Sequence, residues 1–264
     1  MLALLPLATL LLAAGADDLT PSPLLEAPPL EVYRLRLAVD IPVIAAGASA
    51  GLLRAYLVEH QVRKRCPCST GELDFLDRGS VGNHSQAAGL ASDITVGVAL
   101  AAPPLIDLFA LGANRAFAED FTVLTETVLV STLLQQVANF GLQRPRPRTY
   151  AGEPSFVHGG KGYLSFYAGH VSTTAAALSA ASFTIGRRYD EHVWPWVVTG
   201  VVTASVGVER VLAGQHFPSD VLAGALVGLG VGIAVPWLHA RAPGAKLTLV
   251  PVPTGRGLAL MGQF

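Results

Sequence analysis

From residue 41 onward, the chain alternates long apolar segments with short polar stretches. The apolar segments cover residues 41–58, 92–111, 121–141, 170–186, 193–208 and 221–238. A helix rises about 1.5 Å per residue, so each segment is long enough to cross or nearly cross the roughly 30 Å hydrocarbon core of a bilayer. The pattern therefore predicts an all-α protein, a membrane-embedded helical bundle with a six-helix core.

The last apolar segment, residues 221–238, carries no charged side chain. Within it, Gly224, Gly228 and Gly232 recur every four residues, which places them on one face of a helix. Glycines in this arrangement let a neighbouring helix approach closely in lipid. We therefore expect this helix to pack tightly against another one.

Other apolar segments contain polar side chains, namely Arg54, Asp107, Glu126, Gln135 and Gln136. Polar groups are costly against lipid, so we expect these helices to bury a polar stripe against their neighbours. Composition agrees with a lipid environment, because only 14% of the residues are charged, against about 25% in an average soluble domain. A soluble, secreted all-helical protein with an Ala/Gly-rich core is the alternative.

The net charge of −1 provides no basic field for a nucleic-acid backbone, and we expect no nucleic-acid partner. Cys66 and Cys68 are the only cysteines of the 264 residues. They lie too close together for an easy bridge and are too few for a zinc site, so the sequence assigns them no function.

The two ends of the chain differ from the apolar middle. Residues 1–16 form a short apolar run that ends in Ala-Gly-Ala, which resembles a secretory signal cleaved after Ala16. Because this run lacks Lys and Arg, an uncleaved anchor is the alternative. A Pro-rich lead covers residues 17–40, and the single helical domain covers residues 41–240. The tail, residues 241–264, alternates apolar and polar residues around a Thr-Gly-Arg-Gly turn, which predicts a hairpin.

Polar residues with chemical potential gather at the ends of the apolar segments. After the third segment, Arg144, Arg146 and Arg148 alternate with prolines that stop the helix and stiffen the turn. Taken alone, this is also typical of a basic juxtamembrane stop. Before the fourth segment, Gly169 and His170 open a helix whose N-terminal N–H groups and dipole favour an anion. The alternative for that stretch is a capping turn with an incidental histidine.

The third polar cluster precedes the last apolar segment. His216 and Asp220 are four residues apart, so a helix that starts near Pro218 lets the carboxylate reach one imidazole nitrogen and fix the tautomer. The other ring nitrogen is then free to attack an electrophile. Arg210 ends the preceding helix and is expected in the same pocket. No further clustered His, Cys or carboxylate completes a metal site with this pair.

In order and spacing, the three clusters resemble the signature of the type 2 phosphatidic acid phosphatase superfamily. That pattern is Lys-x6-Arg-Pro, then Pro-Ser-Gly-His, then Ser-Arg-x5-His-x3-Asp, and it matches here at residues 139–147, 167–170 and 209–220. Four positions depart from it, namely Asn139 for lysine, Tyr167 for proline, Ala168 for serine and Glu209 for serine. The missing lysine and serine bind phosphate in the family, so the departures bear on catalytic strength.

The resemblance implies metal-independent hydrolysis of a lipid phosphate or pyrophosphate through a phosphohistidine, with no cofactor. It implies that His216 is the nucleophile, that Asp220 orients it and that His170 protonates the leaving oxygen. The implied phosphate-binding groups are Arg146, Arg210, Gly169 through its backbone, Asn139 in the lysine position, and Arg144 or Lys161 in place of that lysine. A silent family member that binds phosphorylated lipid and a structural membrane bundle are the alternatives.

The expected partners are the membrane and a phosphorylated lipid, and the expected location is a bacterial-type cell membrane with the site facing the periplasm or exterior. Six spans after a cleaved signal would instead put the site on the cytoplasmic side. Either the first segment does not fully span, or the N-terminus stays inside. Basic residues at 63–65 and 187–188 lie on opposite sides and do not decide between these topologies.

Overall fold

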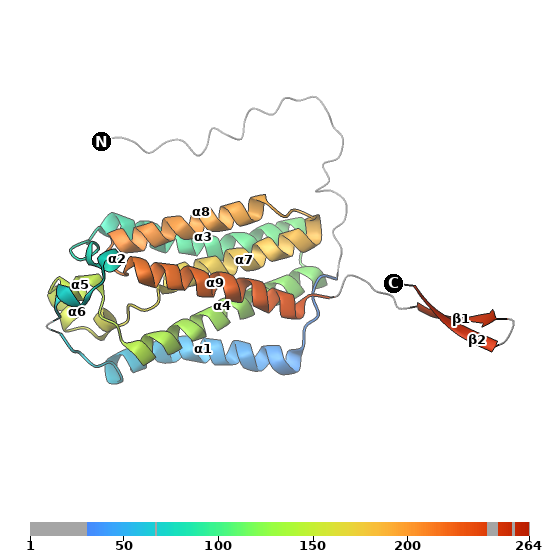
Figure 1. Cartoon of the computed structure of the whole chain (residues 1–264), viewed down its shortest axis with the longest axis horizontal. Helices are drawn as coiled ribbons and strands as arrows, with labels where there is room; N and C mark the ends of the chain where they lie inside the picture. The colour runs from blue at the N-terminus through green and yellow to red at the C-terminus, as the bar shows by residue number, and fades with distance from the viewer. Residues whose placement is uncertain (1–30, 67, 242–247, 255–256, 264) are drawn as a thin grey trace, which may run out of the picture.

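The computed structural model describes residues 31–66, 68–241, 248–254 and 257–263 (Figure 1). Residues 1–16 and most of the Pro-rich lead therefore lie outside the described residues. The six predicted helices are present as α1 (Leu37–His60), α3 (Gln86–Leu111), α4 (Arg115–Leu142), α7 (Gly169–Tyr189), α8 (Trp194–Leu212) and α9 (Pro218–His239). The prediction of an all-α bundle with a six-helix core is confirmed.

Helix α7 is the centre of the bundle and packs against α3, α4, α8 and α9. Its buried positions are mostly alanine, serine and threonine, because a helix with neighbours on all sides has room for small side chains only. The predicted glycine face of α9 lies against it. A Cβ on Gly224, Gly228 or Gly232 would come within 2.3–2.7 Å of a carbonyl oxygen of the α7 segment. These glycines therefore set the distance between α9 and α7.

The outside of the bundle is apolar. Leu52 on α1 is 84% exposed and Phe109 on α3 is 86% exposed, and many other large apolar side chains also face outward. Polar residues face inward instead, and Glu126, Gln135 and Gln136 of α4 are buried as predicted. Within the described residues, four helical segments are long and apolar enough to cross a membrane, namely 37–60, 86–111, 115–150 and 218–239. This arrangement places the protein in a membrane rather than in water.

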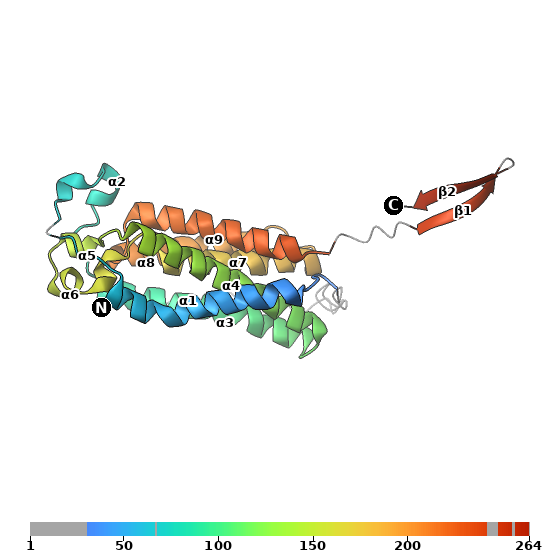
Figure 2. The same ribbon diagram turned by 90° about the horizontal axis from the view of Figure 1, so that it is seen from below.

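Short elements cover one end of the bundle, on the left in Figures 1 and 2. They are η2 (Thr70–Glu72), α2 (Phe75–Arg78), α5 (Pro147–Tyr150), α6 (Pro154–Val157) and η3 (Gly160–Tyr163). The chain enters and leaves the bundle at the opposite end, where Arg34 N–H donates to the carbonyl of His239 at 2.8 Å. The start of α1 and the end of α9 therefore lie on the same side of the bundle.

Two local predictions had different outcomes. The predicted hairpin is present, because β1 (Thr248–Thr254) pairs antiparallel with β2 (Gly257–Gln263). The expectation that Cys66 and Cys68 form no easy bridge is wrong, since a disulfide joins them with their Cα atoms 4.6 Å apart. The turn between α1 and η2 brings the two side chains together, which residue spacing alone did not indicate.

Candidate active site

Backbone hydrogen bonds bring the three polar clusters together at the covered end of the bundle. Ser165 N–H donates to the carbonyl of Arg144 at 2.9 Å, which joins the segment after α4 to the segment before α7. Ala168 N–H donates to the carbonyl of Asp220 at 3.1 Å, which joins that segment to the first turn of α9. Prolines begin both α5 and α9, because a proline at the first helical position loses no hydrogen bond.

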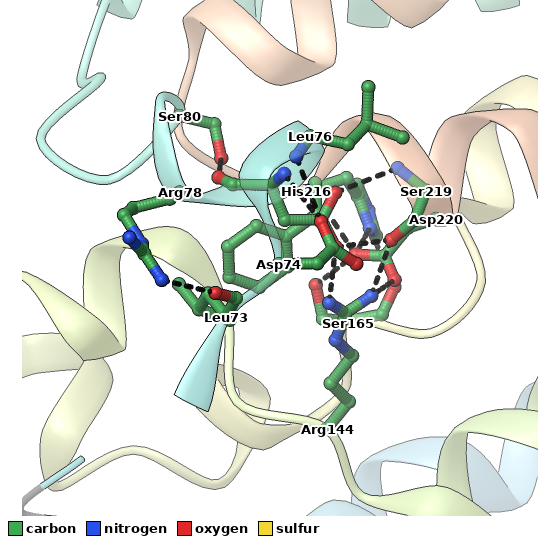
Figure 3. Close-up of polar contacts among 12 residues, drawn as sticks. Leu73, Asp74, Leu76, Arg78, Ser80, Arg144, Ser165, His216, Ser219 and Asp220 are labelled. Carbon is green, nitrogen blue, oxygen red and sulfur yellow. Dashed lines mark hydrogen bonds and ion pairs between the residues drawn. The ribbon is translucent and has the colours of Figure 1, made fainter. Parts of the chain in front are cut away.

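His216 lies in the turn between α8 and α9 and is buried, with 2% of its surface exposed. Its Nδ1 atom is 2.7 Å from the backbone carbonyl of Ser165 (Figure 3). A carbonyl oxygen only accepts hydrogen bonds, so Nδ1 carries the proton and Nε2 keeps a free lone pair. Burial, and then the nearby positive charges of Arg146 and Arg210, lowers the pKa of His216 well below its ordinary value. The free imidazole is therefore neutral and nucleophilic.

Asp220 does not contact His216 as the sequence predicts. The closest approach, from Oδ2 to His216 Nδ1, is 3.9 Å, which is too long for a hydrogen bond. Asp220 instead accepts hydrogen bonds from Ser165 Oγ at 2.5 Å and from the backbone N–H of Phe217 at 2.9 Å. The carbonyl of Ser165 fixes the tautomer of His216, and Asp220 positions the residue that carries this carbonyl.

Arg144 is held by two carboxylates, and so it is not a free cation for phosphate. It donates to Asp220 Oδ1 and to Asp77 Oδ2, both at 2.6 Å (Figure 3 shows the first). Its guanidinium also lies 4.4 Å from the centre of the Phe217 ring. The sequence-based suggestion that Arg144 replaces the missing lysine therefore lacks support from the geometry, and Lys161, the other suggestion, has an exposed side chain in η3.

Asp77 is a residue that sequence reasoning missed. It lies in α2 and accepts from the backbone N–H of Ser219 at 3.0 Å and from its hydroxyl at 2.5 Å, so it caps the start of α9. Burial raises the pKa of Asp77, but the hydrogen bonds from Ser219 and Arg144 outweigh burial and hold it below its ordinary value. Asp77 thus joins α2 to the start of α9, which directly follows the turn that contains His216. Asp77 lies far from the three motifs in the sequence, so no sequence pattern indicated this role.

Arg146 and Arg210 retain unused donors. Arg146 donates to Gln215 Oε1 and to the carbonyl of Leu164, and no carboxylate of the described chain lies within ion-pair distance of it. Arg210 donates to Ser92 Oγ and Asp93 Oδ1, both at 3.2 Å. The buried Nε atoms of both arginines have no partner among the residues that the structure describes. Two such guanidiniums near the neutral imidazole of His216 suit a tetrahedral anion.

His170 and Gly169 form the first turn of α7, and no side chain caps this turn. Its N–H groups and the positive end of the helix dipole therefore remain available to an anion. His170 Nε2 lies 2.9 Å from Oδ1 of Asp93 on α3, the same oxygen that Arg210 contacts. Sequence reasoning did not single out Asp93. The sequence signal that could have indicated Asp93 is that it is an acidic residue within the predicted apolar segment 92–111.

The positions that depart from the family pattern are also at this end. Asn139 is buried, donates to the carbonyl of Gln135 at 3.0 Å and leaves its Oδ1 without a partner in the described structure. Tyr167 is buried and its hydroxyl likewise has no described partner. Ala168 is fully buried and offers no hydroxyl, and Glu209 accepts only from Ser205 at 3.3 Å. None of these four side chains supplies a cation to the site.

Arg54 is a further cation near this level of the bundle. Helices α1 and α4 run side by side in the same direction, with Gly47 against Leu129 and Gln61 against Gln143. Because both contacts have the same sequence offset, position 54 of α1 is in register with position 136 of α4, one turn before Asn139. Its Nη1 atom is buried and has no partner within the described chain, and the same holds for the side-chain amide of Gln136. The α1–α4 side of the site therefore contains unpaired polar groups close to Asn139, the position where the family pattern has lysine.

A comparison with protein-family models agrees with the motifs. The model of the PAP2 superfamily matches residues 121–243, a segment that contains all three clusters. The solved structure of a transmembrane PAP2-type phosphatidylglycerolphosphate phosphatase from Bacillus subtilis is similar at 15% identity, with a TM-score of 0.46 and coverage of 76% of this chain and 94% of that one. No curated protein matches the chain.

Proposed function

We propose that this chain is a member of the PAP2 superfamily and hydrolyses a membrane lipid phosphate or pyrophosphate through a phosphohistidine on His216, without a metal ion at the reacting phosphate. The observation that carries the proposal is the environment of His216. Its Nδ1 proton is held by the Ser165 carbonyl, which directs the Nε2 lone pair into a site with two incompletely paired arginines. This is the arrangement that in-line phosphoryl transfer to an imidazole requires.

The reaction proceeds in two balanced steps. Nε2 of His216 forms a bond to phosphorus while the bond from phosphorus to the lipid oxygen breaks, and His170 donates a proton to that oxygen. The oxygen of a water molecule then forms a bond to phosphorus while the bond from phosphorus to His216 Nε2 breaks, and the water gives a proton to His170. This step releases inorganic phosphate and regenerates the neutral His216 imidazole. Asp93, which contacts His170 at 2.9 Å, positions the imidazole for both proton transfers.

Arg146, Arg210 and the first-turn N–H groups of α7 bind the equatorial phosphate oxygens in this mechanism. The negative charge on these oxygens differs between the bound substrate and the transition state. Donors that are already held in place in a buried site stabilise the transition-state charge without having to reorganise. Asp220 and Arg144 do not bind the phosphate in this mechanism. They act indirectly, because they hold Ser165 and the start of α9 in place. In this mechanism Arg144, which is paired with carboxylates, has a structural role. Arg146 and Arg210, which are incompletely paired, bind the substrate phosphate.

The position of the site fits a lipid substrate. The site lies at one end of a bundle whose outer surface is apolar, and we infer that this end lies where a lipid phosphate meets water. We place this end on the periplasmic or exterior side of a bacterial-type membrane, because disulfides such as Cys66–Cys68 persist in oxidising compartments. The segment before α1 then stays on the cytoplasmic side, which argues against cleavage of an export signal after Ala16. Labelling of a cysteine introduced at Glu191 only after membrane permeabilisation would support this topology, and labelling in intact cells would contradict it.

A silent family member that binds phosphorylated lipid is the second candidate. The observation that favours it is Asn139, which is buried where the family pattern has lysine and brings no charge. Binding of lipid phosphate without any turnover would establish this alternative.

Phosphate release in detergent tests the proposal. Phosphatidate, a prenyl pyrophosphate and a lipid A phosphate should be assayed in parallel, and we expect release from at least one of them. Activity should persist in EDTA at a temperature well below the melting temperature, and vanadate should inhibit because it mimics five-coordinate phosphorus. Loss of activity in a folded, chelated protein, with recovery on adding a divalent ion, would contradict a metal-independent reaction.

Restoring the missing lysine should accelerate the enzyme. We expect Asn139→Lys to raise kcat by about 10²-fold with little change in KM, because one charged donor in such a site typically affects the rate by that amount. Ala168→Ser should add to the effect if its hydroxyl reaches the same oxygen. Asn139→Met, which has similar length without charge, is the matched control. An unchanged kcat for Asn139→Lys would contradict the prediction. Arg54 would then be the residue that supplies the missing positive charge, and Arg54→Ala should lower kcat.

A further inference from the structure

Three ionisable side chains from distant parts of the sequence meet at the end of the bundle opposite the active site. They are Asp40 in the first turn of α1, Glu126 in α4 and His239 in the last turn of α9. Their exposed fractions are 1%, 5% and 9%, respectively. One ligand atom from each lies within 4.8 Å of the other two. Ionisable groups buried this deeply require a partner that compensates their charge.

The hydrogen bonds of His239 define which ring nitrogen faces the two carboxylates. Nδ1 lies 2.8 Å from the carbonyl of Val235, and a carbonyl can only accept, so Nδ1 carries a proton. Nε2 faces Oδ1 of Asp40 and Oε2 of Glu126, at 3.2 Å from each. If the imidazole is neutral, three lone-pair donors converge on one point. Such an arrangement is stable only with a cation or a proton at that point.

The Asp40 contact lies at the long end of an ordinary hydrogen bond, and both separations also suit a shared metal cation. A charge-assisted hydrogen bond between imidazolium and carboxylate is typically about 2.7–2.9 Å long. Zinc–ligand bonds of about 2.0–2.1 Å in tetrahedral geometry instead place neighbouring ligand atoms roughly 3.3 Å apart. The two observed separations of 3.2 Å are close to this tetrahedral spacing.

The remaining contacts of the three side chains are those of metal ligands. Glu126 Oε2 is buried and directed at His239 Nε2, yet it has no hydrogen-bond partner in the described part of the chain. A metal-bound histidine usually donates its other N–H to a backbone carbonyl, as His239 does to Val235. Asp40 is oriented in the same way, because its Oδ2 accepts the backbone N–H of Arg36 at 2.6 Å. Two carboxylates also balance the charge of a divalent ion.

We propose that Asp40, Glu126 and His239 bind one divalent transition-metal ion, with Zn²⁺ as the best fit to a mixed nitrogen and oxygen ligand set. The ion joins the first, third and last long helices at the end far from His216, and its role is structural. The inference does not rest on the proposed function, because none of the three residues lies in the phosphate site. Three protein ligands leave one tetrahedral position for water.

The test uses the full chain, purified in detergent with a tag that contains no histidine. After removal of metal with EDTA, titration with Zn²⁺ alone is expected to bind about one ion per chain and raise the melting temperature by several degrees. Glu126→Gln keeps the size of the side chain but removes the charge, and is expected to reduce Zn²⁺ affinity by at least about 10-fold. His192→Ala removes an exposed histidine that pairs with Asp190, and this matched control should bind normally.

A folded wild-type protein that binds no Zn²⁺, and whose melting temperature Zn²⁺ does not change, would overturn the proposal in favour of a protonated His239. Equal affinity in Glu126→Gln and wild type would also overturn it. Because metal content and melting temperature are the readouts, these outcomes are independent of phosphatase activity. Failure of the metal proposal and failure of the proposed function are therefore distinguishable.

Discussion

Replacing His216 with alanine is expected to lower kcat by about 10⁴-fold to 10⁶-fold, which is the usual range when a nucleophile or its essential partner is removed. No other side chain of the described site presents an imidazole nitrogen whose opposite nitrogen is hydrogen-bonded to a backbone carbonyl at this depth. The measurement is phosphate release from the best of the three lipid substrates. Rapid quenching with labelled substrate should trap an acid-labile phosphoprotein in wild type and none in the variant.

Because His216 is buried, the variant must be shown to be folded. His158→Ala is the matched control, since His158 is exposed, follows α6 and belongs to the same end of the bundle. The melting temperatures of both variants should be measured beside their activities. If folded His216→Ala keeps most of its activity, the phosphohistidine mechanism is wrong.

Replacing Arg146 with alanine is expected to lower kcat by about 10²-fold to 10³-fold, because a buried donor to the transferring phosphoryl group is lost. Arg148 is two residues away and has a different environment. Its guanidinium donates to Glu153 and lies 4.4 Å from the centre of the Phe156 ring. Arg148→Ala is therefore a matched control in the same Pro-rich turn, and it should keep kcat within a few-fold of wild type.

The same pair of variants separates catalysis from stability. Arg146 has a buried Nε atom and no carboxylate partner in the described chain, so its removal relieves an unfavourable charge. We expect Arg146→Ala to melt no lower than Arg148→Ala while losing far more activity. If Arg146→Ala melts much lower, or if both variants lose activity equally, Arg146 is a structural residue and the assignment of phosphate binding to it fails.

Local patterns in the sequence were sufficient for much of the architecture. Apolar runs predicted all six long helices because lipid requires continuous apolar surface, and the Thr-Gly-Arg-Gly turn predicted the C-terminal hairpin. The four-residue glycine spacing predicted a close helix contact, which α9 makes with α7. These predictions succeeded because helix period, turn chemistry and hydrophobicity are properties of neighbouring residues.

Motif spacing predicted which residues form the candidate site, but it did not predict the contacts within the site. The spacing of His216 and Asp220 suggested a direct hydrogen bond, whereas the backbone carbonyl of Ser165 occupies that position and Asp220 binds Ser165 instead. A backbone carbonyl has no residue-specific signature, so no motif can indicate it. The Cys66–Cys68 bridge was missed for a related reason, because residue spacing does not specify how two cysteine side chains are oriented.

The sequence by itself determined which segments become helices, that they belong in a membrane and which residues resemble a phosphatase signature. Only the tertiary structure decided how charges are paired. It paired Arg144 with Asp77 and Asp220, and it left Arg146 without a described carboxylate partner. It also brought His239 into contact with Asp40, 199 residues away in the sequence, and with Glu126. The physical reason is that a buried charge is stabilised by whatever group lies within a few ångströms in space, and helix packing sets that distance independently of position along the chain.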